Sequence, residues 1–341
     1  MPSFRTGAVE EILSERTGLQ RVLVDGERAY VLTELIGPVR VGDRVVVNTT
    51  AVDLGLGTGG WHVVHWNLAR DELHQPGPGH IMKLRYTGLQ LDTGSIEELD
   101  PASADSLEGL PVVATGLHSL VAPIAAAIAE RRPGTRVAYV MTDDGALPLA
   151  LSDLVHDLVR SGLVSTTISC GQAFGGAHEA VTVASGLVHA RHRLDADVAV
   201  VAMGPGNVGT STRLGTSALG QVPALDLAGR LGGRPILGLR ASFADGRDRH
   251  RGISHHSLSV LELLGGAVRV PVATAWVERL AIDLETIDPR HEVVHVDAPG
   301  VLGALSVAGI ELTSMGRPAR DDPCFVDLAA AAGAVAADLV P

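Results

Sequence analysis

From residue 111 onward, short apolar runs alternate with segments of helical periodicity. The runs that we predict as strands are PVVATG, TRVAYVMT, STTISC, DVAVVAMG, PILGLRAS and AVRVPVAT. The segments between them that we predict as helices lie near residues 118–132, 151–162, 177–194, 225–233 and 255–266. Near-continuous apolar strands that alternate with helices are typical of a parallel sheet covered on both faces. The pattern therefore predicts an α/β domain over residues 111–341.

Residues 4 to about 70 follow a different pattern of short, β-rich runs separated by Gly, Asp and Asn. This close spacing predicts a small β-barrel of five or six strands over residues 1–72. The segment GPVRVGDRV resembles a turn of SH3-like and OB-type barrels, and no function follows from that likeness. Residues 73–110 are expected to form one strand, over 80–87, and an acidic connection.

The amino-acid composition and net charge argue against some classes of function. Of the 341 residues, 46% are hydrophobic but only 3% are aromatic, so the core must consist of Val, Leu, Ile and Ala. The formal net charge of -12 argues against a general nucleic-acid or anionic-membrane binder, because such proteins need clustered Lys and Arg. The two cysteines, Cys170 and Cys324, form no disulfide framework. Together with an N-terminus that lacks a signal-peptide core, they predict a cytoplasmic protein.

The segment 196–217 combines an apolar strand with a glycine-rich turn and a polar stretch, Thr210 to Arg213, that we interpret as the first turn of a helix. Such a turn directs backbone N–H groups toward an anion. We expect ligand contacts here and in the loop that follows the next strand. The predicted ligand-binding residues are Gly204, Gly206, Gly209, Thr210, Ser211, Arg213, Arg249 and His250.

Two nucleotide-binding patterns fit this turn incompletely. Gly204, Gly206 and Gly209 match the dinucleotide pattern G-x-G-x-x-G, but no acidic residue ends the next strand. In the P-loop pattern, Thr210 stands where the lysine belongs. Tight helix–sheet packing, anion binding and nucleotide binding all remain open interpretations of the turn.

The segment 247–256 is the richest in histidine and arginine. Ser254 is a candidate N-cap, which places His255 and His256 in the first turn of a helix, where imidazole tends to stay neutral. Neutral imidazoles suit metal ligation, proton abstraction or hydrogen bonding to a carbonyl. Adjacent helical residues ligate one metal only with strain, so His250 with His255, or one of these with His118 or His178, is an easier pair. No established metal-ligand spacing is present, and we assign no metal or other cofactor.

Other predicted strand ends also carry titratable groups. We expect His118, and His178 at the start of a helix, to join His255 and His256 as candidate catalytic residues. Asp143-Asp144 fits a general base, a magnesium ligand or an ordinary turn. Cys170 fits a nucleophile or a small buried residue.

The blocks GHIMKLRYT, GQAFGGAHEAV, MGPGNVGTSTRLG and RDRHRGISHHS together resemble an uncharacterised bacterial, mainly actinobacterial, family of unknown function. The resemblance implies a bacterial cytosolic protein and no particular activity. From the residues we expect an enzyme that acts on a small phosphorylated or carboxylated metabolite at the strand-end crevice. A non-catalytic sensor or assembly module that binds a metabolite or nucleotide is the alternative. Neither a nucleic acid nor a membrane is an expected partner, and a homo-oligomer is compatible with the sequence.

Overall fold

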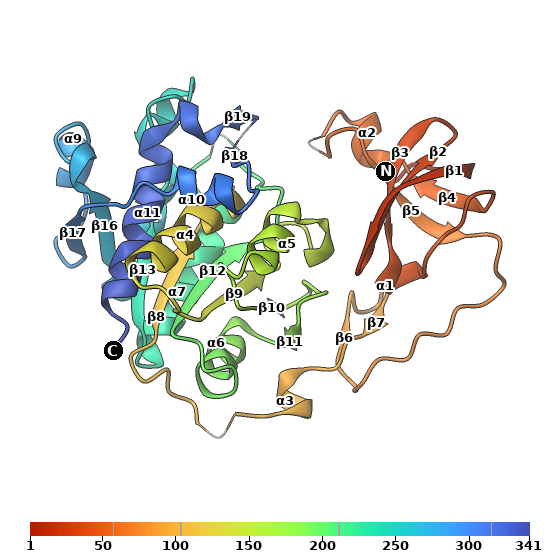
Figure 1. Cartoon of the computed structure of the whole chain (residues 1–341), viewed down its shortest axis with the longest axis horizontal. Coiled ribbons are helices and arrows are strands. Elements are labelled where there is room, and N and C mark those ends of the chain that lie inside the picture. The colour runs from red at the N-terminus through yellow and green to blue at the C-terminus, as the bar shows by residue number, and fades with distance from the viewer. Residues whose placement is uncertain (57, 103, 211, 315) are drawn as a thin grey trace. The chain divides into compact units, whose positions relative to one another are not determined.

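The first strands of the chain close into a barrel in the order β1-β2-β3-β5-β4 (Figure 1). They are β1 (Phe4–Arg16), β2 (Leu19–Val24), β3 (Glu27–Leu32), β4 (Arg44–Asn48) and β5 (His62–Asn67). Alternate valines, among them Val22, Val45 and Val47, point inward and are fully buried. The predicted barrel of five or six strands is confirmed. The computed structural model describes residues 1–56, 58–102, 104–210, 212–314 and 316–341, in two units, Met1–Gly94 and Ser95–Pro341.

The strand expected over residues 80–87 is much shorter than predicted. Only β6 (Met82–Lys83) is extended, and it pairs with β7 (Leu91–Asp92). Leu84 and Tyr86 have φ angles of 51° and 61°, a left-handed conformation that no strand can continue. Short helices α1 (Thr33–Ile36), α2 (Thr50–Asp53) and α3 (Ile96–Leu99) complete this part of the chain.

The second unit is built on an eight-stranded sheet of order β11-β10-β9-β12-β8-β13-β16-β17, whose neighbouring strands run parallel. Its strands are β8 (Pro111–Thr115), β9 (Val137–Thr142), β10 (Thr166–Cys170), β11 (His178–Ala180), β12 (Val198–Met203), β13 (Arg234–Gly238), β16 (Arg269–Ala273) and β17 (Glu292–Val296). The central strands are buried on both faces, as continuous apolar runs require. The α/β fold class is confirmed.

Helices cover both faces of this sheet. On one face pack α4 (Val121–Arg131), α5 (Asp153–Arg160), α10 (Leu302–Val307) and α11 (Pro323–Asp338). On the other pack α6 (Val183–His192), α7 (Gln221–Arg230) and α8 (His255–Leu263). The short helix α9 (Ala281–Glu285) lies between β16 and β17 in the chain. None of the helices in the described residues has the length and hydrophobicity to cross a membrane.

Helices α4 and α11 lie side by side and pack closely (Figure 1). A Cβ on Gly333 of α11 would lie 2.3 Å from the carbonyl oxygen of Ile124 in α4. Only glycine permits this approach, so the position fixes how near the two backbones come. Most of α11 is buried, including Phe325 and Leu328.

The chain reverses its direction of winding after β11, where α6 leads back to the central strand β12. Strands β8 and β9 lead into helices α4 and α5 on one face, whereas β12, which lies between them, leads into α7 on the other face. Ligands in open α/β sheets bind beyond the carboxyl ends of strands at such a switch point.

Two predicted helix starts are wrong. Thr210, Thr212 and Arg213 do not begin a helix, which starts only at the 3-10 turn η3 (Ser217–Gly220) before α7, while Ser211 lies outside the described residues. The Thr210 amide donates to Gly215 O and its hydroxyl contacts Thr212 Oγ1, so local hydrogen bonds replace helical ones. His178 does not open a helix either: it begins β11, which pairs in parallel with β10, and α6 starts at Val183.

Candidate functional site

Three histidines gather where the loop after β13 enters helix α8. The loop 243–251 is closed by a short antiparallel pair, β14 (Ala241–Ser242) and β15 (Gly252–Ile253), and its 3-10 turn η4 (Asp248–His250) delivers His250. Ser254 then caps α8, as predicted, and His255 and His256 are its first residues. We name His250, His255 and His256 the histidine cluster.

The rings of the histidine cluster face one another. Their centroids lie 5.0 Å apart for His250 and His255, 5.1 Å for His250 and His256, and 4.0 Å for His255 and His256. One ring nitrogen from each residue lies within 4.8 Å of the other two. His250 and His256 are buried and His255 is half-buried, so solvent reaches the cluster at His255.

Hydrogen bonds orient His250 and leave nitrogens of the other two rings unused. His250 Nδ1 lies 2.8 Å from Ser254 Oγ, which also accepts the backbone N–H of His256. Arg249 Nε donates to His250 Nε2 over 3.4 Å, so Nε2 carries the lone pair and Nδ1 the proton. His255 Nε2 and His256 Nδ1 are buried and have no hydrogen-bond partner among the described residues.

The three imidazoles are neutral at pH 7. Burial and the nearby guanidinium of Arg240 lower the pKa of His250 to about 3. Burial and the neighbouring His255 lower the pKa of His256 to about 4. Burial and Arg249 also lower the pKa of His255. Each ring can therefore accept a proton or offer a lone pair to a metal.

A network of buried charge supports the loop that carries His250. Arg247 holds Asp245 with two hydrogen bonds of 2.9 and 2.8 Å, and Arg240 contacts the same carboxylate at 3.3 Å. Hydrogen bonds from Arg247 strongly lower the pKa of Asp245, whose side chain is only 3% exposed. The Arg249 guanidinium is exposed beside the cluster, where it can meet an anion.

The glycine-rich loop lies against the histidine cluster, and two of its backbone N–H groups are bonded within the loop. A Cβ on Gly209 would lie 3.5 Å from His256 Nε2, so this glycine faces the ring with little space between them. The N–H groups of Val208 and Thr210 are already bonded to Ser217 Oγ and Gly215 O. Gly206 is exposed with φ of 91°, as a turn requires. Ser211 lies outside the described residues.

A small cavity lies at the switch point. Gly204 is buried, and a Cβ on it would lie 2.3 Å from the carbonyl oxygen of Ala146. The cavity beneath is lined by Thr142, Asp144 and Gln221, among others, and its volume of about 10 Å³ holds about one water molecule. Burial raises the pKa of Asp144. A metabolite does not fit this cavity.

His118 follows β8 in the chain, and its ring lies beside the end of β12. Both ring nitrogens have hydrogen-bond partners. Nδ1 is 3.0 Å from Met203 O, and Nε2 is 2.7 Å from Ser152 Oγ, the N-cap of α5. Burial lowers the pKa of His118 to about 4. These contacts link β12 to α5, so His118 can stabilise the fold without binding a ligand.

His178 and Arg213 lie apart from the histidine cluster. His178 is on β11 at the edge of the sheet, where its ring is 5.4 Å from that of His189. Arg213 forms an ion pair with Glu262 near the end of α8, and both side chains are exposed. Of the four predicted catalytic histidines, only His255 and His256 share one place, and there they join His250.

Comparison with protein families gives one match. Residues 28–333 match the model described as "Protein of unknown function (DUF3866)". The chain belongs to the DUF3866 family. The matched range begins in the barrel and ends in α11, so the family includes both units. No curated protein and no solved structure matches this DUF3866 chain.

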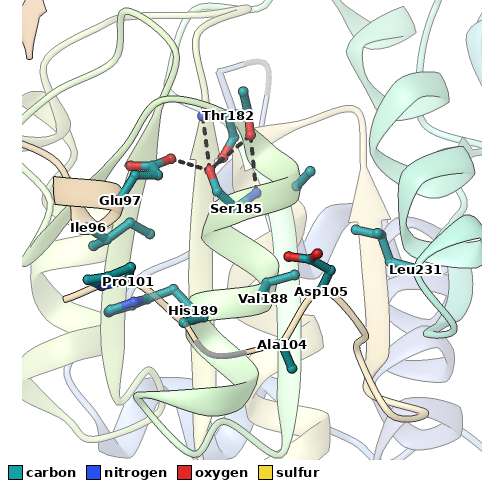
Figure 2. A pocket seen from close by; sticks show the side chains of 12 residues that line it. Ile96, Glu97, Pro101, Ala104, Asp105, Thr182, Ser185, Val188, His189 and Leu231 are labelled. Carbon is teal, nitrogen blue, oxygen red and sulfur yellow. Dashed lines mark hydrogen bonds between the residues drawn. The ribbon is translucent and has the colours of Figure 1, made fainter.

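A larger cavity of about 530 Å³ lies against α6, away from the histidine cluster (Figure 2). Glu97 accepts hydrogen bonds from the Ser185 hydroxyl and the backbone N–H of Val181. Apolar side chains such as Val188 and Leu231 form much of the wall. None of the predicted site residues lines this cavity.

Two residues from the C-terminal part of this DUF3866 chain, Arg317 and Asp322, support the loop that carries His250 and were not predicted from the sequence. Asp322 accepts the Ser242 hydroxyl at 2.5 Å, and Arg317 lies 3.9 Å from the carboxylates of both Asp245 and Asp322. Both residues are far from the loop in sequence and belong to no recognisable motif. A covariation signal between Asp322 and Ser242 is what would have found them.

Proposed function

We propose that the protein is an enzyme that acts on a small anionic metabolite, phosphorylated or carboxylated, at the histidine cluster. The observation that carries the proposal is the convergence of three neutral imidazoles, two of which have a buried ring nitrogen without a partner among the described residues. Leaving such atoms without partners costs stability, and groups of this kind concentrate at functional sites.

The surrounding charges favour an anion as the substrate. Arg249 is exposed beside His250, and Arg247 is partly exposed while it holds Asp245. Guanidinium groups bind phosphate and carboxylate through paired N–H donors. In this proposal Arg249 binds the anionic group, and His255 and His256 face the reacting atoms.

A panel of phosphorylated and carboxylated metabolites, followed by ³¹P and ¹H NMR, tests the proposal. We expect the wild type to convert at least one compound and His256→Ala to lose at least about 100-fold in kcat/KM, the scale of acid–base catalysis. His156→Ala is the matched control because His156 is exposed on α5. Arg249→Ala should raise KM more than it lowers kcat.

Two results would contradict the proposal. If metabolites raise the melting temperature but none is converted, the protein is a sensor or assembly module instead. If His256→Ala lowers the melting temperature strongly and leaves kcat/KM near the wild-type value, His256 is a structural residue.

We also propose that the protein is bacterial, of actinobacterial type, and cytoplasmic. Cys170 and Cys324 are buried free thiols, which suits a reducing compartment. The net charge of -12 supports a small-molecule partner over nucleic acid or an anionic membrane. A homo-oligomer remains part of this proposal, and light scattering of the purified protein tests it.

A further inference from the structure

The histidine cluster has the donor chemistry of a metal centre. Its three imidazoles come from η4 and from the first turn of α8, and the nitrogens His255 Nε2 and His256 Nδ1 have no partner within the described part of the chain. Neutral imidazole is a preferred ligand of Zn²⁺ and other divalent transition metals. Calcium and magnesium prefer oxygen ligands, so they fit this cluster poorly.

The residues around the cluster supply the support that metal-bound histidines require. A ligating imidazole donates its second N–H to a neighbouring acceptor, which fixes the ring orientation. His250 does so through Nδ1 and the Ser254 hydroxyl, which leaves its Nε2 lone pair directed at Arg249. A metal would take the place of that long Arg249 contact.

The ring nitrogens of the histidine cluster must move closer together to bind one metal ion. The nitrogens lie within 4.8 Å of one another, whereas tetrahedral Zn–N bonds of about 2.0–2.1 Å require roughly 3.3 Å between ligands. Binding one ion therefore requires the rings to move closer by rotation about their side-chain bonds. The positive charges of Arg240 and Arg247 oppose a cation, but Asp245 pairs with both.

We propose that His250, His255 and His256 bind one divalent transition metal of the Zn²⁺ class and leave a coordination position open. Three protein ligands with an open position are the pattern of catalytic rather than structural zinc. The inference rests on the proposed function in taking this cluster as the centre of the site. Arg249 would hold an anionic substrate whose oxygen enters the open position.

Cobalt titration of the untagged full-length chain tests the inference. After removal of metals by chelation, we expect one Co²⁺ per chain, visible-range absorption bands of a nitrogen-ligated tetrahedral ion, and displacement by Zn²⁺. His255→Ala and His256→Ala should each weaken binding by more than the roughly 10–100-fold typical of losing a supporting partner. His156→Ala should bind as the wild type does.

A second measurement needs no variant. Zn²⁺ should protect His255 from modification by diethylpyrocarbonate in the wild type, while the exposed His156 is modified equally with and without the metal. Mass spectrometry of the digested protein reads both sites in the same sample. This comparison holds even if a substitution in the cluster prevents folding.

The outcomes separate the two proposals. Stoichiometric Co²⁺ that depends on His255 and His256 supports the metal site, and it does so even if no metabolite is converted, in which case the enzyme proposal fails. Absence of binding, or equal binding in His255→Ala, overturns the metal site. Metal-independent turnover that requires His256 would then leave the enzyme proposal intact.

Discussion

Single glycines decide how the loops at the carboxyl edge of the sheet meet. A Cβ on Gly145 would lie 2.4 Å from Gly204 O, and a Cβ on Gly204 would lie 2.3 Å from Ala146 O. The two loops therefore touch backbone to backbone. Gly204 fits the dinucleotide pattern in sequence, and in the structure this glycine permits close backbone packing.

This contact makes Gly204 intolerant of substitution. Gly204→Ala should lower the free energy of unfolding by roughly 1–3 kcal/mol, because the added methyl group meets backbone that cannot move aside. Gly300→Ala is the control, since a Cβ there has nothing within 4 Å. Urea denaturation compares the two, and equal stability would show that the loops separate easily.

The titration of His118 gives a prediction for stability against pH. Its folded pKa of about 4 lies below the unfolded value of 6.5, so the unfolded chain binds more protons between these values. Stability should be complete above pH 6.5 and fall as the pH drops toward 4, with His118 contributing up to roughly 3 kcal/mol.

His118→Gln, which cannot titrate, should reduce the slope of unfolding free energy against pH by up to one proton, measured in the presence of a chelator. The remaining slope comes from groups such as His250 and His256, whose pKa values are also lowered. His156→Gln should keep the wild-type slope because His156 is exposed. A wild-type slope in His118→Gln would mean that His118 titrates normally in the folded protein.

At the scale of elements, the buried central strands could be predicted from the sequence. The short strands β6 and β11 and some helix starts could not. Buried parallel strands such as β9 and β12 are continuous apolar runs, a signal that needs no tertiary information. Ser254 was recognisable as a cap because capping is local. Thr210 failed because its hydroxyl bonds within the loop, and His178 failed because pairing with β10 overrides its local preference.

The candidate site, too, could be predicted only in part. His250, His255 and His256 lie within one turn and one loop, so the sequence brings them near one another. The supporting ion network could not be predicted, because Asp322 reaches Ser242 only through the packing of the C-terminal part of the chain.

The cap of α8 links helix stability to the cluster. Ser254→Ala should cost about 1 kcal/mol through the lost N-cap, and it also frees the His250 ring. Ser259→Ala, in the same helix but away from its end, should cost less. Thermal denaturation measures the stability, and the histidine ring resonances in NMR report the change at His250. An unchanged His250 resonance in Ser254→Ala would contradict the predicted role of the cap.

At the scale of the whole molecule, the two units have separate cores. The barrel core includes Val22, Val47 and Val64, whereas the sheet of the second unit has its own apolar clusters on both faces. A unit with its own core can fold by itself.

We therefore expect residues 95–341 to fold without the barrel. The fragment should give dispersed NMR amide resonances and a cooperative thermal transition. Residues 1–94, expressed alone, serve as the matching test of the barrel. A molten or aggregated 95–341 fragment would show that the second unit depends on the first.

The burial of α11 has a consequence for synthesis of the chain on the ribosome. The apolar face of α4 is made early, but α11, the helix that covers it with Gly333 set against Ile124, is made much later. At roughly 5–20 residues per second, that face waits on the order of ten seconds for its cover. During this interval the nascent chain exposes an apolar surface that a ribosome-associated chaperone is expected to shield, and the unit can finish folding only after α11 has left the ribosome.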